Sequence, residues 1–216
     1  MAALAEVLSA HGVSRRDAAF VATVTGPEPA PFAYLGAKHM VTGYDHLLFL
    51  VGVIFFLYRL KDVVTYVSLF TLGHSLTLLG GVLGDVRANA YLIDAVIGLS
   101  VVYKGFENIG GFDRVLGFRP NTKIAVLTFG LFHGFGLATK LQELALPPSG
   151  LFANLLSFNV GVELGQVLSL GAVLTGLLYW RSRPGFNRHA FAANALLMMG
   201  GFLLVGYQLT GFFLSE

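Results

Sequence analysis

Histidine and carboxylate side chains gather at the start of one apolar stretch, Gly36 to Leu50, which reads GAKHMVTGYDHLLFL. This stretch carries His39, Asp45 and His46. An Asp side chain costs about 2.5–3.5 kcal/mol at the centre of a membrane helix on insertion scales. An Asp-His pair inside a run of membrane length is therefore a candidate functional site.

The spacing of the two histidines limits what they can do together. His39 and His46 are seven residues apart, so they share a face of a regular helix but lie about 10 Å apart along it. One ion could bridge them only if the helix were broken, and Gly43 between them could allow a break. Otherwise His39 is an outer gathering ligand, and Asp45 and His46 belong to a deeper site. The structural alternative is an interfacial histidine beside an Asp-His hydrogen bond.

Two more histidines lie in later apolar stretches. His74 lies in SLFTLGHSLTLL, where the hydroxyls of Thr71 and Thr77, three residues to either side, could orient its ring. His133 lies in FGLFHGFGLA, where two glycines four residues apart form a close-packing surface. Either histidine could be a metal ligand or a residue that only packs helices together.

A polar triad follows in FNVGVELGQ. Asn159, Glu163 and Gln166 are spaced by four and three residues, so they project from one face of a helix that we expect to turn toward the bundle interior. They could coordinate a cation, relay protons or tie helices together. The third apolar stretch adds Asp94, a similar polar group, and at its end Glu107 and Asn108, where helix capping is an equal explanation.

The available donor atoms narrow the chemistry. The chain has no cysteine, which excludes disulfides, thiolate ligands and cysteine nucleophiles. Neutral imidazoles with carboxylates suit divalent transition metals such as nickel, zinc or cobalt, and with few Met residues copper(I) is less favoured. The expected ligand is a divalent transition metal ion of unspecified identity.

The composition indicates which elements must position these residues. Of 216 residues, 55% are hydrophobic and 12% charged, which indicates a polytopic membrane protein. The net charge of +2 does not suggest nucleic acid. We expect an all-α fold: a bundle of six transmembrane helices over residues 36–216, after a short N-terminal tail over residues 1–35. The expected spans cover residues 37–58, 63–83, 90–109, 124–141, 151–180 and 190–214.

The tail is expected to be partly amphipathic or irregular. Ala3, Leu4, Val7 and Leu8 could form one face of an interfacial helix, and three prolines over residues 27–31 are expected to end any helix.

The basic residues orient the predicted bundle. The loops after the first, third and fifth spans hold more of them than the opposite side does: Arg59, Lys61, Arg114, Arg119, Lys123, Arg181, Arg183 and Arg188. The positive-inside rule places this side in the cytoplasm and both termini in the periplasm of a bacterial inner membrane. Most intramembrane polar groups then fall in the outer half of the bilayer.

Taken together, these motifs resemble the HupE/UreJ family of membrane proteins. The matching stretches are HMVTGYDHLLFL, FTLGHSLTL, LIDAVIGLSVVYKGFENI, FGLFHGFGLA and FNVGVELGQ, in that order. The resemblance implies a metal permease, with nickel uptake the best-known assignment, and a metal-handling role for His39, Asp45, His46 and His133. Asp94 stands where the third motif is expected to carry Glu.

We therefore expect an inner-membrane permease for a divalent transition metal, in which His39, Asp45 and His46 capture the ion. His74, Asp94, His133 and Glu163 would form the deeper site or path, with Asp45 or Glu163 as the protonation site of any ion-coupled transport. Three alternatives stay open: an intramembrane zinc-dependent hydrolase, haem ligation by two histidines, and an accessory subunit of a larger membrane complex. A homo-oligomer is compatible with each.

Overall fold

The computed structural model describes residues 15–143 and 148–215, and their regular structure is entirely helical. The interfacial helix predicted around Ala3 to Leu8 lies outside these residues. In chain order the elements are α2 (Arg15–Thr23), α3 (Pro29–Thr42), α4 (Tyr44–Ile54), α5 (Leu60–Leu83), α6 (Ala90–Asn108), the π-helix η1 (Phe112–Leu116), α7 (Thr122–Gln142), α8 (Leu151–Arg181) and α9 (Phe186–Leu214).

Four helices in the described ranges are long and apolar enough to cross a membrane: α5, α7, α8 and α9. They match the second, fourth, fifth and sixth predicted spans to within a few residues. The helix α6 matches the third, but Asp94, Lys104 and Glu107 make it more polar than the other four. The all-helical membrane class is thus confirmed, whereas a count of six spans does not follow from helix length and apolarity.

The first predicted span differs most from expectation. It is not one helix over residues 37–58 but two helices, α3 and α4, separated by Gly43. The described helix before the three prolines, α2, ends at Thr23, and the next helix, α3, begins at Pro29. A proline in the first helical turn removes an N–H group that has no partner inside the helix, and its φ already suits helical backbone.

Three pairs of helices pack closely along their length: α3 with α8, α5 with α7, and α6 with α9. Glycines allow these close approaches. A Cβ atom at Gly161 would overlap the backbone oxygen of Ala33, and one at Gly134 would overlap that of His74. The α6–α9 pair approaches in the same way, since a Cβ at Gly201 would lie 2.9 Å from the Gly98 oxygen. Small residues play this part in membrane helices generally.

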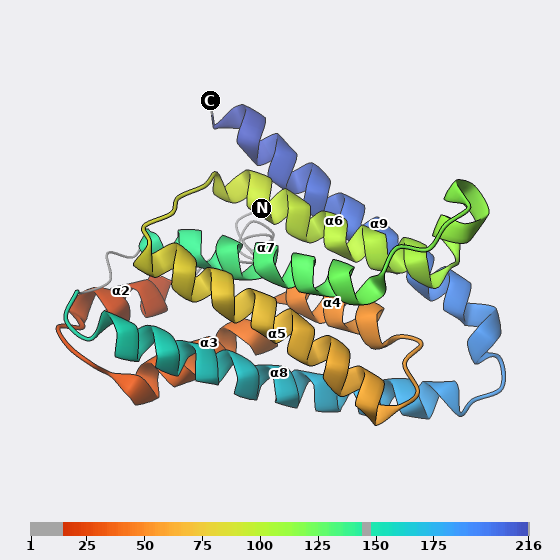
Figure 1. Ribbon diagram of the computed structural model, residues 1–216, viewed down its shortest axis with the longest axis horizontal. Helices are drawn as coiled ribbons and strands as arrows, with labels where there is room; N and C mark the ends of the chain where they lie inside the picture. The colour runs from red at the N-terminus through yellow and green to blue at the C-terminus, as the bar shows by residue number, and fades with distance from the viewer. Residues whose placement is uncertain (1–14, 144–147, 216) are drawn as a thin grey trace.

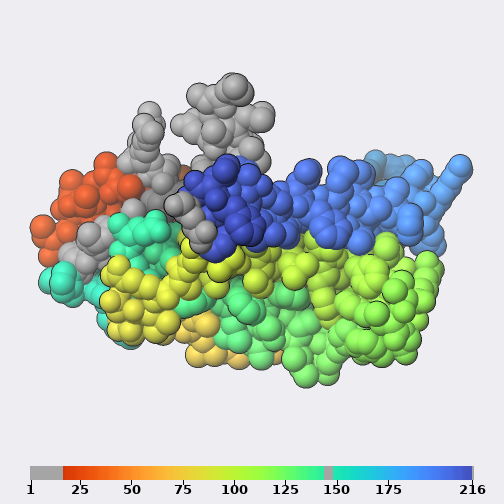
Figure 2. All heavy atoms as spheres, turned by 90° about the horizontal axis from the view of Figure 1, so that it is seen from above, coloured from red at the N-terminus to blue at the C-terminus, as the bar shows by residue number. Residues whose placement is uncertain are grey.

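The short helix α4 lies between the pairs and contacts members of all three. The long helices run roughly along one axis, and the three basic loops, near residues 59–61, 110–123 and 181–188, share one end of the molecule (Figure 1). The start of α3 and the C-terminal end of α9 lie toward the other end. Figure 2 shows α9, in blue, running along the outside of the bundle beside α6.

Candidate metal centre

Gly43 breaks the helix at the point that matters for the two histidines of the first motif. Its backbone is extended, with φ −74° and ψ 95°, between the last residue of α3 and the first of α4. The chain therefore changes direction, and the ring centroids of His39 and His46 come within 5.0 Å. There is little room for a side chain at this position, because a Cβ on Gly43 would lie 2.9 Å from the His39 oxygen and 3.0 Å from Nδ1 of His46.

His46 stands at the centre of a group of four imidazoles, which we call the histidine cluster: His39, His46, His74 and His133. From the centroid of its ring, the other three rings lie at 5.0, 5.9 and 4.9 Å respectively. Two imidazoles bound to one tetrahedral ion would have centroids about 5 Å apart, so the spacing is that of rings able to share an ion. Four separate helices, α3, α4, α5 and α7, supply one ring each.

The cluster is enclosed except at His39, which is half-buried. The side chains of Asp45, His46, His74 and His133 are each no more than 1% exposed. The rings of Phe49 and Phe70 lie 5.3 and 5.0 Å from that of His133 and form an apolar wall on the same side. Hydrophobic surroundings that exclude water strengthen electrostatic interactions and metal–ligand bonds within the site.

Neighbouring acceptors fix two of the rings. Nδ1 of His46 lies 3.2 Å from the Asp45 carboxylate, the carboxylate–histidine arrangement that often orients a metal-binding ring. Nδ1 of His133 donates to the backbone oxygen of Phe129 at 2.7 Å, which leaves the lone pair of the neutral ring on Nε2. Both nitrogens of His74 are buried, and neither makes a hydrogen bond within the described residues.

The rings meet edge to face, at interplanar angles of 68–78° about His46. As the side chains stand, no three His, Asp or Glu residues in the described part of the chain are placed to hold one ion together. The side chains are thus gathered but do not converge on a common point.

Comparison with known proteins gives one match. The sequence profile of the HupE / UreJ protein family matches residues 15–216. The chain belongs to the HupE/UreJ family. No curated protein and no solved structure matches it.

The HupE/UreJ motifs contribute unequally to the centre. The first, second and fourth motifs recognised in the sequence supply the histidine cluster and Asp45, whereas the third and fifth motifs supply polar groups elsewhere. The histidine cluster and the adjacent Asp45 are therefore the five residues predicted as metal ligands, from stretches nearly a hundred residues apart in sequence.

The polar triad of α8 does not share one environment. Asn159 and Gln166 are 7% and 1% exposed, but Glu163 is exposed, so the expectation that all three face the bundle interior was wrong for Glu163. At about 100° per residue, Glu163 lies about 160° around the helix from both Gly161 and Gly165, the glycines that contact α3. It is thus on the face turned away from that partner.

Asp94 was expected in the deeper site or path, but its 5% exposed carboxylate is paired with Lys140 of α7 at 2.7 Å. This ion pair joins α6 to α7. Lys140 was not predicted as the partner of Asp94, although its position near the end of the fourth predicted span, 124–141, was an available signal.

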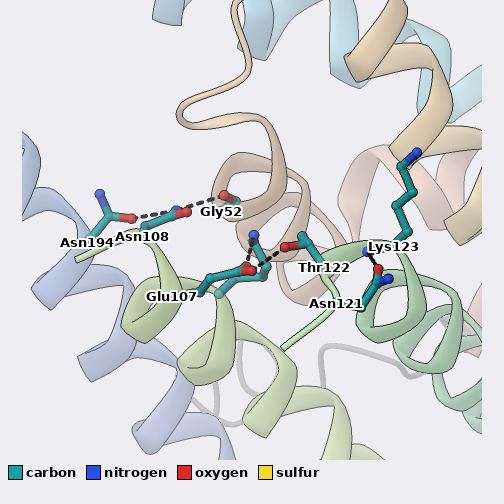
Figure 3. A network of polar contacts seen from close by, with 8 residues as sticks. Gly52, Glu107, Asn108, Asn121, Thr122, Lys123 and Asn194 are labelled. Atoms are coloured by element: carbon teal, nitrogen blue, oxygen red, sulfur yellow. Dashed lines mark hydrogen bonds and ion pairs between the residues drawn. The ribbon is translucent and has the colours of Figure 1, made fainter. Parts of the chain in front are cut away.

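Glu107 and Asn108 lie at the end of α6, away from the histidine cluster. Glu107 pairs with Lys104 and accepts a hydrogen bond from Thr122, while Asn108 donates to the Gly52 oxygen and to Asn194, both at 2.8 Å (Figure 3). These bonds tie α6 to α4, α7 and α9 beside a cavity of about 360 Å³.

The threonines flanking His74 also act differently from expectation. Thr77 donates to the backbone oxygen of Leu131 at 2.6 Å, and Thr71 donates to Gln166 at 3.0 Å. The idea that their hydroxyls orient the His74 ring was therefore wrong. Each links α5 to a neighbouring helix, Thr77 to α7 and Thr71 to α8.

Proposed function

We propose that this protein is a permease that moves a divalent transition metal ion, nickel or the chemically similar zinc or cobalt, across the bacterial inner membrane. The observation that carries the proposal is the buried histidine cluster around His46, with Asp45 beside it. Membership of the HupE/UreJ family supports a membrane metal-transport role.

In this proposal the chain crosses the membrane six times, with the broken α3–α4 unit as the first crossing and α5 to α9 as the others. The shared end of the basic loops supports placing that end in the cytoplasm. His39, the least buried ring of the cluster, captures the ion from the periplasmic side. The imidazoles of His46, His74 and His133 then bind the ion. They bind it as neutral rings, since protons compete with the metal for imidazole nitrogens.

Metal content of the purified protein, measured by mass spectrometry after loading with nickel, zinc or cobalt, tests the site. We expect bound metal in the wild type and its loss in the His46→Ala/His133→Ala double variant. His189→Ala is the matched control, because His189 is exposed at the start of α9. Equal metal content in wild type and double variant would contradict the assignment of the site.

An intramembrane metallohydrolase is the second candidate, because a specific observation favours it. The rings of His74 and His133 lie 5.9 and 4.9 Å from that of His46, with Asp45 beside it, and these three histidines would have to converge further to form the three-histidine zinc site of such an enzyme. Uptake into proteoliposomes separates the two functions. A permease accumulates metal inside the vesicles, whereas a hydrolase binds metal without moving it and cleaves a lipid ester or amide.

A further inference from the structure

A groove of about 570 Å³ runs along the outside of the bundle between α5 and α8. Its polar lining comes from both helices, and its walls are apolar. The polar residues are Ser68, Thr71 and Ser75 from α5 and Asn159, Glu163 and Gln166 from α8.

The surface around this groove is hydrophobic. Val64, Leu72 and Val167 line its edges and are 54%, 53% and 66% exposed. Since α5 and α8 both have the length and apolarity of membrane-crossing helices, this surface faces hydrocarbon when the protein is in a bilayer. The exposed Glu163 side chain therefore lies on a surface that borders hydrocarbon and not water, where charged side chains are rare.

Some polar groups of the groove have hydrogen-bond partners among the described residues, and others have none. Thr71 donates to Oε1 of Gln166 at 3.0 Å, and Nε2 of Gln166 lies 3.5 Å from the Val67 oxygen. In contrast, Oδ1 of Asn159 and Oγ of Ser75 are buried and have no hydrogen-bond partner among the described residues. Asn159 is 93% buried, and an unsatisfied buried amide is costly unless a ligand or a changed protonation state supplies its partner.

We propose that Glu163 in this groove binds and releases the proton that couples metal transport to the proton gradient. The proton adds to a Glu163 carboxylate oxygen, and the resulting O–H group donates to Oδ1 of Asn159. The two residues are four apart on α8, so their side chains are neighbours on its surface. Release of the proton restores the carboxylate and frees the Asn159 acceptor again.

Among the described residues that line the groove from α5 and α8, Glu163 is the one titratable side chain. His74 is next to Ser75 in sequence, but its ring belongs to the histidine cluster on another face of α5. A proton at Glu163 is thus bound apart from the metal.

The position of the groove explains how a proton there could affect the metal. The groove is the seam between two closely packed pairs, α3–α8 and α5–α7, which contact each other sparsely. His39 belongs to the first pair, while His74 and His133 belong to the second. A change of charge at the seam favours one relative position of the two pairs, and that position determines whether the four rings can share an ion. This step rests on the proposed function; the protonation of Glu163 does not.

The first experiment tests protonation in the wild-type protein, reconstituted in liposomes. A hydrophobic carbodiimide reacts with protonated carboxyl groups, and peptide mass spectrometry locates the adduct. We expect Glu163 to be labelled about tenfold more than Asp85, an exposed carboxylate that pairs with Arg87, and the labelling to fall as pH rises. No adduct at Glu163, or labelling independent of pH, would overturn the proposal.

The second experiment measures Zn²⁺ uptake and internal pH together in proteoliposomes. Glu163→Gln, which carries no titratable proton, should lower the metal-linked proton movement about tenfold, while Asp85→Asn should match the wild type. Unchanged proton movement in Glu163→Gln would refute the coupling role. If the wild type takes up no metal, the proposed function fails instead, and the carbodiimide result still decides whether Glu163 is the proton site.

Discussion

At the scale of single residues, Gly43 decides whether the two histidines of the first motif can meet. A continuous helix would hold His39 and His46 about 10 Å apart, whereas the break at Gly43 places their rings 5.0 Å apart. Lack of a side chain matters here more than an unusual backbone angle. The φ of −74° suits any residue, but the space beside the glycine is filled by the His39 oxygen and the His46 ring.

This leads to a prediction for Gly43→Ala. The added methyl group would push the His46 ring or the end of α3 out of place, and we expect metal affinity to fall by about 10- to 100-fold. Isothermal titration with Ni²⁺ or Zn²⁺ measures the effect. Gly80→Ala is the matched control, because a Cβ there meets no described atom within 4 Å. Equal affinities in the two variants would contradict a positioning role for Gly43.

A second residue, Arg181, fixes the other end of α4. Its guanidinium donates to the backbone oxygens of Ile54, Phe55 and Leu57, and it lies over the ring of Tyr58 at 4.7 Å. A cation suits this place, since the last carbonyls of a helix lack partners and carry partial negative charge.

We therefore predict that Arg181→Gln lowers the free energy of unfolding by about 1–3 kcal/mol, because several carbonyl groups lose their donor. Thermal unfolding in detergent measures the change. Arg183→Gln should have little effect, since that exposed guanidinium contacts Tyr179 one turn away on the same segment. A similar loss in both variants would indicate a general charge effect and not capping of α4.

At the scale of elements, the bundle is built from helix pairs that glycines hold close. The glycines of FGLFHGFGLA show this: Gly130 contacts the backbone of Phe70, and Gly134 contacts that of His74. The α5–α7 pair thus positions two rings of the histidine cluster on adjacent helices. The close-packing role of this motif was correctly predicted from its spacing.

We predict that Gly134→Ala lowers the free energy of unfolding by about 1–3 kcal/mol, because the new methyl group would overlap the His74 oxygen and the helices must separate. Gly176→Ala, where a Cβ meets no described atom within 4 Å, should be neutral or stabilising by up to about 1 kcal/mol. Unfolding monitored by circular dichroism compares them. A Gly134→Ala protein as stable as the Gly176→Ala control would disprove the close contact.

Helix positions were also the most predictable part of this fold. Five of the six predicted spans agree with observed helices to within a few residues, because each is a long apolar run between charged loops. The prediction of a single helix for the first span was wrong, since apolar character alone does not show where a helix breaks. The prediction that Glu163 faces the bundle interior was wrong as well. Spacing gives the relative angles of side chains around a helix but does not show which angle faces the core.

At the scale of the whole molecule, the histidine cluster spans two helix pairs, with His39 on one side and His74 and His133 on the other. The hydrogen bond from Thr71 to Gln166 crosses the seam between them. Because the rings as they stand do not converge on one ion, relative movement of the pairs offers a way to assemble and release a complete set of ligands.

The chain has no cysteine, which makes this movement directly testable. We predict that Thr71→Cys/Gln166→Cys, joined by a short bifunctional thiol reagent, takes up metal about tenfold or more slowly than the same protein without the reagent, and that a cleavable linker restores uptake on reduction. The two single-cysteine variants treated with the same reagent are the controls. Full uptake in the cross-linked protein would exclude movement at this seam.

The sequence by itself determined the membrane class, the positions of five of the six predicted helices and the identity of the candidate ligands, since these depend on composition and on patterns within one segment. The tertiary structure alone decided which side chains meet. It gathered His39, His46, His74 and His133, paired Asp94 with Lys140 and turned Glu163 outward. The physical reason is that such contacts depend on which helices pack together and at which angle, and glycine contacts between distant segments set both.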